Sequence, residues 1–186
     1  MIKRARQLAL QAHGGQKYGA HPYSHHLDQV VALAEPHFPW RLFDEGVAAA
    51  LLHDAVEDTG LTIGEIEHDF GPVVADAVGF CTDADGPSRR LRKRRTYLQM
   101  RASIDEAHRR MHSMNPHKGI PLGVVVKMAD RLANLKATLS DENRALGRMY
   151  LQERGAFLLA ISSPLTPDML VQEYIILMNL VEAMVQ

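Results

Sequence analysis

Apolar residues recur along this chain at spacings of three and four rather than two, and this period predicts helices almost throughout. Glycine, proline and short polar runs divide the pattern into segments. We expect helices over residues 2–13, 27–35, 41–56, 62–71, 73–82, 89–112, 122–139, 142–161 and 167–185, with polar loops over 16–22 and 113–119. The pattern is typical of an all-α helical bundle that forms a single domain over residues 1–186.

Two helix starts carry specific signals. Thr62-Ile-Gly-Glu65 has the spacing of a capping box, in which the two side chains satisfy each other's backbone amides. Thr166 is expected to cap the last helix, with Pro167 at the first helical position.

The composition narrows the class of protein. A chain of 186 residues can bury a core without disulfides, and its single cysteine, Cys81, fits a small core residue in a reducing compartment. A formal net charge of −1 gives no overall attraction to nucleic acid. The first residues are basic but lack the apolar stretch of a secretory signal, and no apolar run is long enough to span a membrane. We therefore expect a cytoplasmic protein.

Two His-Asp dipeptides occur in the chain, and such pairs also arise by chance. His68-Asp69 stands on a short polar helix and is expected at the surface. His53-Asp54 ends the most apolar helix, where an ionised carboxylate is costly unless a positive charge compensates it. Glu57 and Asp58 follow four residues later, so one imidazole and three carboxylates share an edge if the helix continues. Such an edge either lies in solvent or needs a cation.

Two further segments carry candidate ligands. Asp130 and Asn134 lie one turn apart in an otherwise apolar helix. Asp130 needs a partner there, either a metal or a surface pairing with Lys127 or Arg131. His25-His26 stands near the start of the second helix, where either ring could bind a metal or simply begin the helix. Two histidines and two aspartates leave coordination positions open, which suits Mn²⁺ or Fe²⁺ better than a structural zinc site.

Four segments, in order and spacing, resemble the motifs of the RelA/SpoT-type alarmone hydrolases, a family that includes small stand-alone members. The segments are Ala12-His-Gly-Gly-Gln16, Pro22-Tyr-Ser-His-His26, Leu51-Leu-His-Asp-Ala-Val-Glu-Asp-Thr59 and Lys127-Met-Ala-Asp-Arg-Leu-Ala-Asn134. The resemblance implies an all-α HD domain. It also implies an enzyme that removes the 3′-pyrophosphate from guanosine tetra- or pentaphosphate, with Mn²⁺ as the usual metal.

The same resemblance implies roles for particular residues. The metal ligands would be His26, His53, Asp54 and Asp130. Glu57 and Asp58 match the family's acidic pair, which positions and deprotonates the attacking water. A carboxylate base beside a metal ion is suited to that reaction near neutral pH. Asn134 matches the asparagine that contacts the nucleoside.

The loop after the first helix departs from the family's pattern. The family commonly has an arginine there, near the base, whereas this chain has Gln16-Lys-Tyr-Gly-Ala-His21 and is about one residue shorter. Lys17 or Tyr18 would have to take over, Tyr18 by stacking on a purine. The family's His-Pro is His26-Leu27 here. These changes leave the base and the exact substrate open.

Six of the seven residues from Arg89 to Arg95 are cationic. The absence of interleaved aromatic residues and the net charge argue against nucleic-acid binding. The run is then either a solvated helix face or a contact surface for the pyrophosphate, with Lys93 and Arg94 as the first candidates. We favour the second because a substrate with four or five phosphates needs cations beyond one metal. Tyr150 and Arg154, on the next helix, are further candidates for this pocket.

The leading hypothesis is an alarmone 3′-pyrophosphohydrolase with no synthetase domain attached. One alternative is an HD phosphohydrolase for another nucleotide, such as an adenine alarmone or a nucleoside monophosphate. A second is a non-catalytic HD module that binds nucleotides, which the complete set of histidine and acidic residues disfavours. The expected partners are a nucleotide and a divalent metal, with no nucleic acid and no membrane. The oligomeric state stays open, a homodimer included.

Overall fold

The computed structural model describes residues 1–110 and 119–186, most of them helical. The helices are α1 (Ile2–His13), α2 (Tyr23–Ala34), α3 (Phe43–Leu52), α4 (Ala55–Asp58), α5 (Ile63–Phe70), α6 (Pro72–Cys81), α7 (Arg89–Arg110), α8 (Gly119–Ser140), α9 (Arg144–Ile161) and α10 (Asp168–Val185), with 3₁₀ turns at Glu35–His37 and Trp40–Leu42. The predicted all-α bundle is confirmed.

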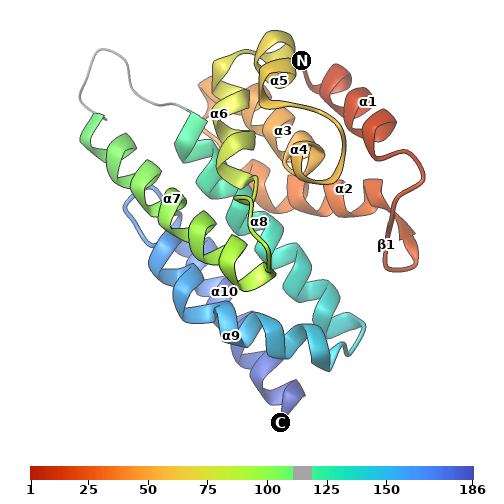
Figure 1. Cartoon of the computed structure of the whole chain (residues 1–186), viewed down its shortest axis with the longest axis vertical. Helices are drawn as coiled ribbons and strands as arrows, with labels where there is room; N and C mark the ends of the chain where they lie inside the picture. Colours follow the sequence, from red (N-terminus) through yellow and green to blue (C-terminus); the bar gives the residue numbers. More distant parts are fainter. Residues whose placement is uncertain (111–118) are drawn as a thin grey trace.

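Helix α8 runs through the middle of the molecule (Figure 1). It packs against α2, α3 and α6 in one part of the bundle and against α7, α9 and α10 in the other. Every residue from 122 to 133 is buried. At Gly123 an added Cβ would lie 2.8 Å from the Cβ of Phe80, so glycine is what lets α6 approach this closely. The β-branched start of α8 is helical because this packing outweighs local preference.

Several element boundaries differ from the predicted ones. Helix α2 begins at Tyr23 rather than residue 27, and the predicted helix 41–56 is interrupted between α3 and α4. The predicted loop 16–22 contains a small antiparallel hairpin of β1 (Lys17–Tyr18) and β2 (His21–Pro22). Residues 111–118, which include most of the second predicted loop and the predicted end of the helix 89–112, lie outside the described residues.

The two predicted caps had different outcomes. The capping box is confirmed: the amide of Glu65 donates to Thr62 Oγ1 at 3.2 Å, and the amide of Thr62 donates to Glu65 Oε2 at 2.9 Å. The predicted cap at Thr166 is wrong. Pro167 occupies the N-cap position of α10, and the Thr166 hydroxyl donates back to the carbonyl of Ile161.

Two expectations about the rest of the chain can also be compared with the structure. Cys81 is fully buried, and its thiol lies 3.6 Å from the carbonyl oxygen of Gly123, as expected of a core residue. Among the described residues no helix combines the length and the apolar character needed to cross a membrane.

Candidate active site

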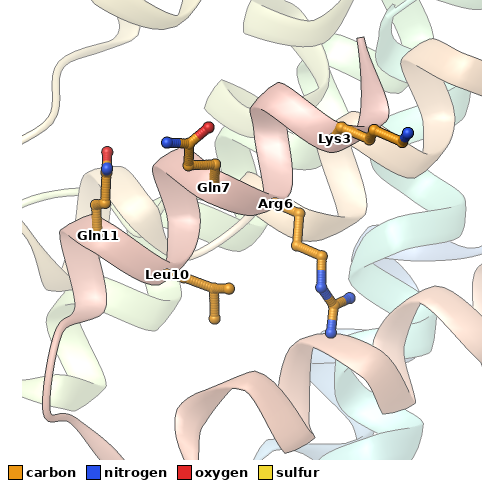
Figure 2. A pocket seen from close by; sticks show the side chains of 5 residues that line it. All are labelled: Lys3, Arg6, Gln7, Leu10 and Gln11. Carbon is orange, nitrogen blue, oxygen red and sulfur yellow. The ribbon is translucent and has the colours of Figure 1, made fainter.

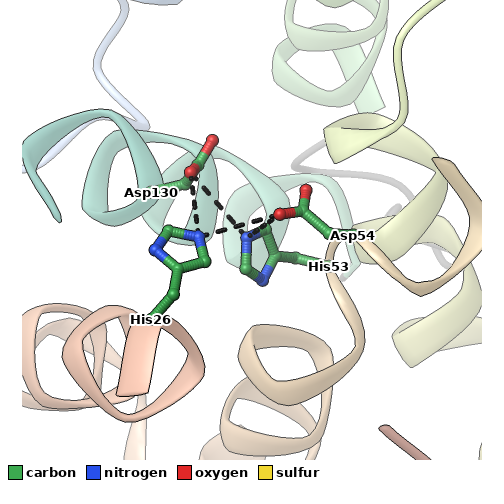
Figure 3. A group of neighbouring side chains, drawn as sticks. All are labelled: His26, His53, Asp54 and Asp130. Carbon is green, nitrogen blue, oxygen red and sulfur yellow. Dashed lines mark ion pairs between the residues drawn. The ribbon is translucent and has the colours of Figure 1, made fainter. Parts of the chain in front are cut away.

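Four side chains from three parts of the chain converge beside α8 (Figure 3). His26 comes from the first turns of α2, His53 and Asp54 from the turn between α3 and α4, and Asp130 from the middle of α8. One ligand atom from each lies within 4.8 Å of the other three. The Nε2 atom of His53 is 3.0 Å from Asp54 Oδ2 and 3.8 Å from Asp130 Oδ1. The Nε2 atom of His26 is 3.7 and 3.5 Å from the same two oxygens.

The hydrogen bonding of His53 fits a cation at this point. Its Nδ1 lies 2.8 Å from the carbonyl oxygen of Ala50 and therefore carries the proton. Nε2 then points into the cluster, where it can hold a second proton or bind a cation. The atom is fully buried and has no hydrogen-bond partner among the described residues, although Asp54 Oδ2 lies 3.0 Å away. A divalent cation would satisfy that nitrogen.

The charges of the cluster also favour a bound cation. Burial alone would lower the pKa of His53, but the adjacent carboxylates of Asp54 and Asp130 outweigh it and raise the pKa to about 10. Burial likewise opposes ionisation of Asp54 and Asp130, yet nearby positive charge holds both pKa values well below their usual range. That positive charge comes from Lys127 and from the imidazoles when they are protonated, and a divalent metal would take the place of the imidazole protons.

Asp130 also has a fixed cation beside it. Lys127 Nζ is 3.4 Å from Asp130 Oδ2 and donates to the carbonyl of Cys81 at 2.9 Å. Both side chains are buried, so the Lys127 pairing considered from the sequence exists within the core and not at the surface. Arg131 pairs instead with Glu153, at 3.2 Å.

Two further side chains orient the acidic ligands. Tyr23, in the first turn of α2, donates its hydroxyl to Asp54 Oδ2 at 2.5 Å. Asn134 donates its amide to Asp130 Oδ1 at 2.5 Å. Hydrogen bonds of this kind fix the direction of a metal-binding carboxylate.

Glu57 and Asp58 do not share one continuous helix edge with His53 and Asp54, because α3 ends before His53 and α4 begins at Ala55. Glu57 Oε2 accepts a hydrogen bond from the amide of Asp83 at 3.1 Å. Asp58 Oδ2 accepts one from Gln16 Nε2 at 2.8 Å. The two acids therefore diverge toward different neighbours. Burial raises the pKa of the Glu57 carboxyl, and Lys127 opposes that rise.

Tyr18 is a predicted substrate residue that packs directly against the cluster. Its ring stacks on His26 with centroids 4.5 Å apart, and its hydroxyl donates to Asn134 Oδ1 at 3.0 Å. Lys17 precedes it on the strand and is exposed. Since successive strand side chains face opposite sides, the two residues cannot both face the cluster in this conformation.

The basic segment of α7 divides into different environments. Lys93 is largely enclosed, and its Nζ lies 2.7 Å from Asp83 Oδ2; burial lowers its pKa. Because Asp83 also donates its amide to Glu57, Lys93 is linked to the acidic pair. Arg94 is exposed. Arg89 pairs with Glu153 of α9 at 2.9 Å.

The two candidate substrate residues on α9 also lie in different environments. Tyr150 is buried, and its ring lies 4.7 Å from the guanidinium of Arg131, the neighbour of Asp130. Arg154 instead contacts α10, where it reaches Glu182 at 3.3 Å and Asn179 at 3.2 Å. The structure thus brings Tyr150 toward the cluster and directs Arg154 to the neighbouring helix.

Several residues that hydrogen-bond to the predicted site residues, or to their partners, had no role assigned from the sequence. Tyr23, Gln16 and Asp83 each bond directly to a predicted site residue, and His13 bonds to Gln16. Tyr23, Gln16 and His13 stand within the motif segments 12–16 and 22–26, which was the available signal. Asp83 lies in no such segment.

A shallow hollow on the outer face of α1 is separate from this site (Figure 2). It is lined by Lys3, Arg6, Gln7, Leu10 and Gln11. Arg6 is held by Asp28 of α2 at 2.6 Å. None of the predicted site residues lines the hollow.

The fold and the His/Asp cluster define a helical domain of the HD class. Residues 5–152 match the HD domain family, and the chain belongs to it. It is 31% identical, over 149 residues, to a guanosine-3′,5′-bis(diphosphate) 3′-pyrophosphohydrolase of Haemophilus influenzae, covering 78% of this chain and 20% of that one. It is 30% identical, over 138 residues, to the GTP pyrophosphokinase rsh of Brucella ovis, covering 73% and 16%. The chain thus spans a fifth or less of these relatives.

Solved structures share the fold. A metazoan ortholog of SpoT that hydrolyzes ppGpp aligns with a TM-score of 0.69 and 23% identity, over 96% of this chain and 93% of that one. The protein lmo0812 of Listeria monocytogenes aligns with a TM-score of 0.58 and 26% identity, over 86% and 98%. The resemblance inferred from the four sequence segments is confirmed.

Proposed function

We propose that this protein is a divalent-metal-dependent hydrolase that removes the 3′-pyrophosphate from guanosine tetra- or pentaphosphate. The observation that carries the proposal is the convergence of two buried imidazoles and two carboxylates beside a separate acidic pair. The relative from Haemophilus influenzae, which bears the name of this reaction, supports the same choice of substrate.

In this proposal His26, His53, Asp54 and Asp130 hold the metal, for which we expect Mn²⁺. A bound divalent metal supplies Lewis-acid polarisation of a phosphoryl oxygen and makes a water molecule more acidic. The donor set of two nitrogens and two oxygens leaves coordination positions open for both.

Glu57 and Asp58 position the attacking water and accept its proton. They stand beside the metal ligands but have separate hydrogen-bond partners, which keeps them out of the ligand set. The raised pKa of Glu57 makes its carboxylate a stronger base than an ordinary glutamate. The proton is accepted at a carboxylate oxygen of this pair.

The remaining predicted residues divide between the two ends of the substrate. Tyr18 and Asn134 contact the cluster and supply aromatic and amide contacts for the nucleoside, and Tyr150, which packs against Arg131, is proposed as a second aromatic contact. Lys93 supplies the enclosed cation for the pyrophosphate. Lys17 and Arg94, which are exposed, are proposed as outer contacts. Arg154 would have to leave Glu182 and Asn179 to serve as a third.

One observation favours a second candidate, an HD phosphohydrolase for a different nucleotide. The aromatic ring of Tyr18 lies over His26, in the loop where the family commonly has an arginine near the base. An aromatic face stacks on any purine, so this position does not itself select guanine.

Incubating the protein and Mn²⁺ with a panel of nucleotides tests the proposal. The panel contains guanosine tetra- and pentaphosphate, the adenine counterparts and guanosine 5′-monophosphate, with products resolved by anion exchange. We expect pyrophosphate and a 3′-hydroxyl product from the guanosine alarmones. Turnover of only the adenine compounds or the monophosphate would favour the second candidate. Mn²⁺ binding without any product would indicate a non-catalytic module.

Lys93→Ala is expected to lower kcat/KM for a 3′-pyrophosphorylated nucleotide about 10- to 100-fold, because a charge-assisted hydrogen bond contributes about 1.5–3 kcal/mol. Arg94→Ala should act in the same direction if it reaches the outer phosphate. A simple monophosphate is too short to reach either residue and should be hydrolysed as by the wild type. The measurement compares kcat/KM for both substrates.

The matched control is Arg109→Ala, at the far end of α7, where the side chain pairs with Glu106. It should leave both substrates unaffected. Equal losses on both substrates with Lys93→Ala would mean that Lys93 only maintains the fold through its pairing with Asp83.

A further inference from the structure

Gln16, in the turn after α1, contacts one member of the acidic pair, Asp58. Gln16 Nε2 lies 2.8 Å from Asp58 Oδ2, and Gln16 Oε1 lies 2.8 Å from His13 Nδ1. Asp58 is otherwise an exposed residue at the end of a four-residue helix. An exposed carboxylate ordinarily samples several rotamers, whereas a group that holds a water needs one orientation.

The donor and acceptor groups of His13, Gln16 and Asp58 determine the direction of the two hydrogen bonds that join them. An ionised carboxylate only accepts, so the amide nitrogen of Gln16 must face Asp58. The amide oxygen of Gln16 then faces His13 and also only accepts, so Nδ1 of His13 carries the proton. In this tautomer His13 donates to the amide oxygen of Gln16 and supports the orientation in which the amide nitrogen faces the acid.

His13 is itself held against the metal-binding side of the site. It is buried, and its ring stacks on Tyr23 with centroids 4.2 Å apart and planes 22° from parallel. Tyr23 donates its hydroxyl to Asp54 at 2.5 Å, and its amide donates to the carbonyl oxygen of Gln16 at 3.1 Å. The same few residues thus contact one predicted metal ligand and one predicted water-holding acid.

The backbones of Asp54 and Asp58 are also connected directly, since the amide of Asp58 donates to the carbonyl oxygen of Asp54 at 2.9 Å. Backbone geometry sets the distance between them, and Gln16, from the turn after α1, and Tyr23, from α2, set the direction of the Asp58 and Asp54 carboxylates. Asp58 Oδ2 is occupied by Gln16, while Oδ1 has no partner within residues 1–110 and 119–186. That oxygen is free to accept from a water molecule.

We propose that Gln16, whose amide orientation is supported by a hydrogen bond with His13, is a positioning residue that aims the Asp58 carboxylate at the attacking water. The inference rests on the proposed function, in which Asp58 acts on that water. Among the described residues, the side chain of Gln16 hydrogen-bonds to Asp58 and His13 and to none of the four proposed metal ligands, so its proposed action is through Asp58.

The test is a double-mutant cycle on the Mn²⁺-loaded enzyme with guanosine tetraphosphate as substrate. Gln16→Met keeps the length of the side chain and removes the donor. It is expected to lower kcat about 10- to 100-fold, the usual effect of losing a supporting hydrogen bond, with KM and the Kd for Mn²⁺ unchanged. In an Asp58→Asn background the same change should lower kcat no further, because the group that it positions is already lost.

Two additional variants strengthen the test. His13→Phe keeps an aromatic ring against Tyr23 but removes the proton donated to Gln16, and it should show the same non-additivity with Asp58→Asn. Gln11→Met is the matched control: this exposed glutamine of α1 lines the hollow in Figure 2 and should behave as wild type. Melting temperatures identify any variant that fails to fold, in which case Gln16→Ala replaces Gln16→Met.

The outcomes separate the inference from the proposed function. Equal losses from Gln16→Met in both backgrounds would show a merely structural role and overturn the inference. A wild-type kcat for Gln16→Met beside a strong loss for Asp58→Asn would overturn the inference while leaving the role of Asp58 standing. A wild-type kcat for Asp58→Asn itself would overturn the role of Asp58, and the inference with it.

Discussion

Replacing His53 or Asp54 with alanine is expected to abolish turnover and metal binding together. Each residue supplies one of the four atoms that lie within 4.8 Å of one another, so either change opens the site and weakens binding. Asp54→Ala also leaves the Tyr23 hydroxyl without its acceptor. Metal content of the purified variants, measured by elemental analysis after dialysis against Mn²⁺, is compared with pyrophosphate release.

The second His-Asp dipeptide provides the control for this experiment. His68 is exposed, and Asp69 forms a surface ion pair with Arg4 at 2.7 Å. His68→Ala and Asp69→Ala should keep both metal and activity. Damage equal to that of the first dipeptide would refute the assignment of His53 and Asp54 as ligands.

The changes Glu57→Gln and Asp58→Asn are expected to lower kcat by about 10²-fold or more while metal content stays near that of the wild type. Both acids have hydrogen-bond partners outside the four-residue cluster, so the cluster itself is left intact. The amide replacements preserve shape but cannot accept a proton from water. Steady-state kinetics and metal analysis on the same preparations distinguish the two effects.

Loss of metal in either variant would place that acid among the ligands instead. Retained metal together with a normal kcat would leave proton acceptance to another group. The two variants need not be equally damaged, because Glu57 lies beside Lys127 and Asp83 whereas Asp58 is held by Gln16.

The apolar period was sufficient to predict the helical bundle and most of its helices, because burial of one helical face imposes that spacing on any sequence. Residue chemistry also selected the correct His-Asp dipeptide for burial: His53 is fully buried and His68 is exposed. An ionised group at the end of an apolar helix must be compensated wherever it lies, so that inference did not depend on tertiary structure.

Helix boundaries near the site depended on contacts between distant segments. The helix is interrupted at His53-Asp54, where both side chains meet His26 and Asp130, and the hairpin at 17–22 packs through Tyr18 against His26 and Asn134. Likewise, the sequence alone left open whether Lys127 pairs with Asp130 at the surface. Burial of α8 between the two parts of the bundle places that pair in the core.

The apolar period of the sequence determined the fold class, and the resemblance of four segments to the alarmone hydrolases supplied the four residues that meet beside α8. Only the tertiary structure decided how the neighbouring acids are held. Asp58 turns to Gln16 and Glu57 to Asp83, partners 42 and 26 residues away in the chain. Side-chain direction depends on which groups the fold brings within hydrogen-bonding distance, and that is a property of packing between elements rather than of spacing within one.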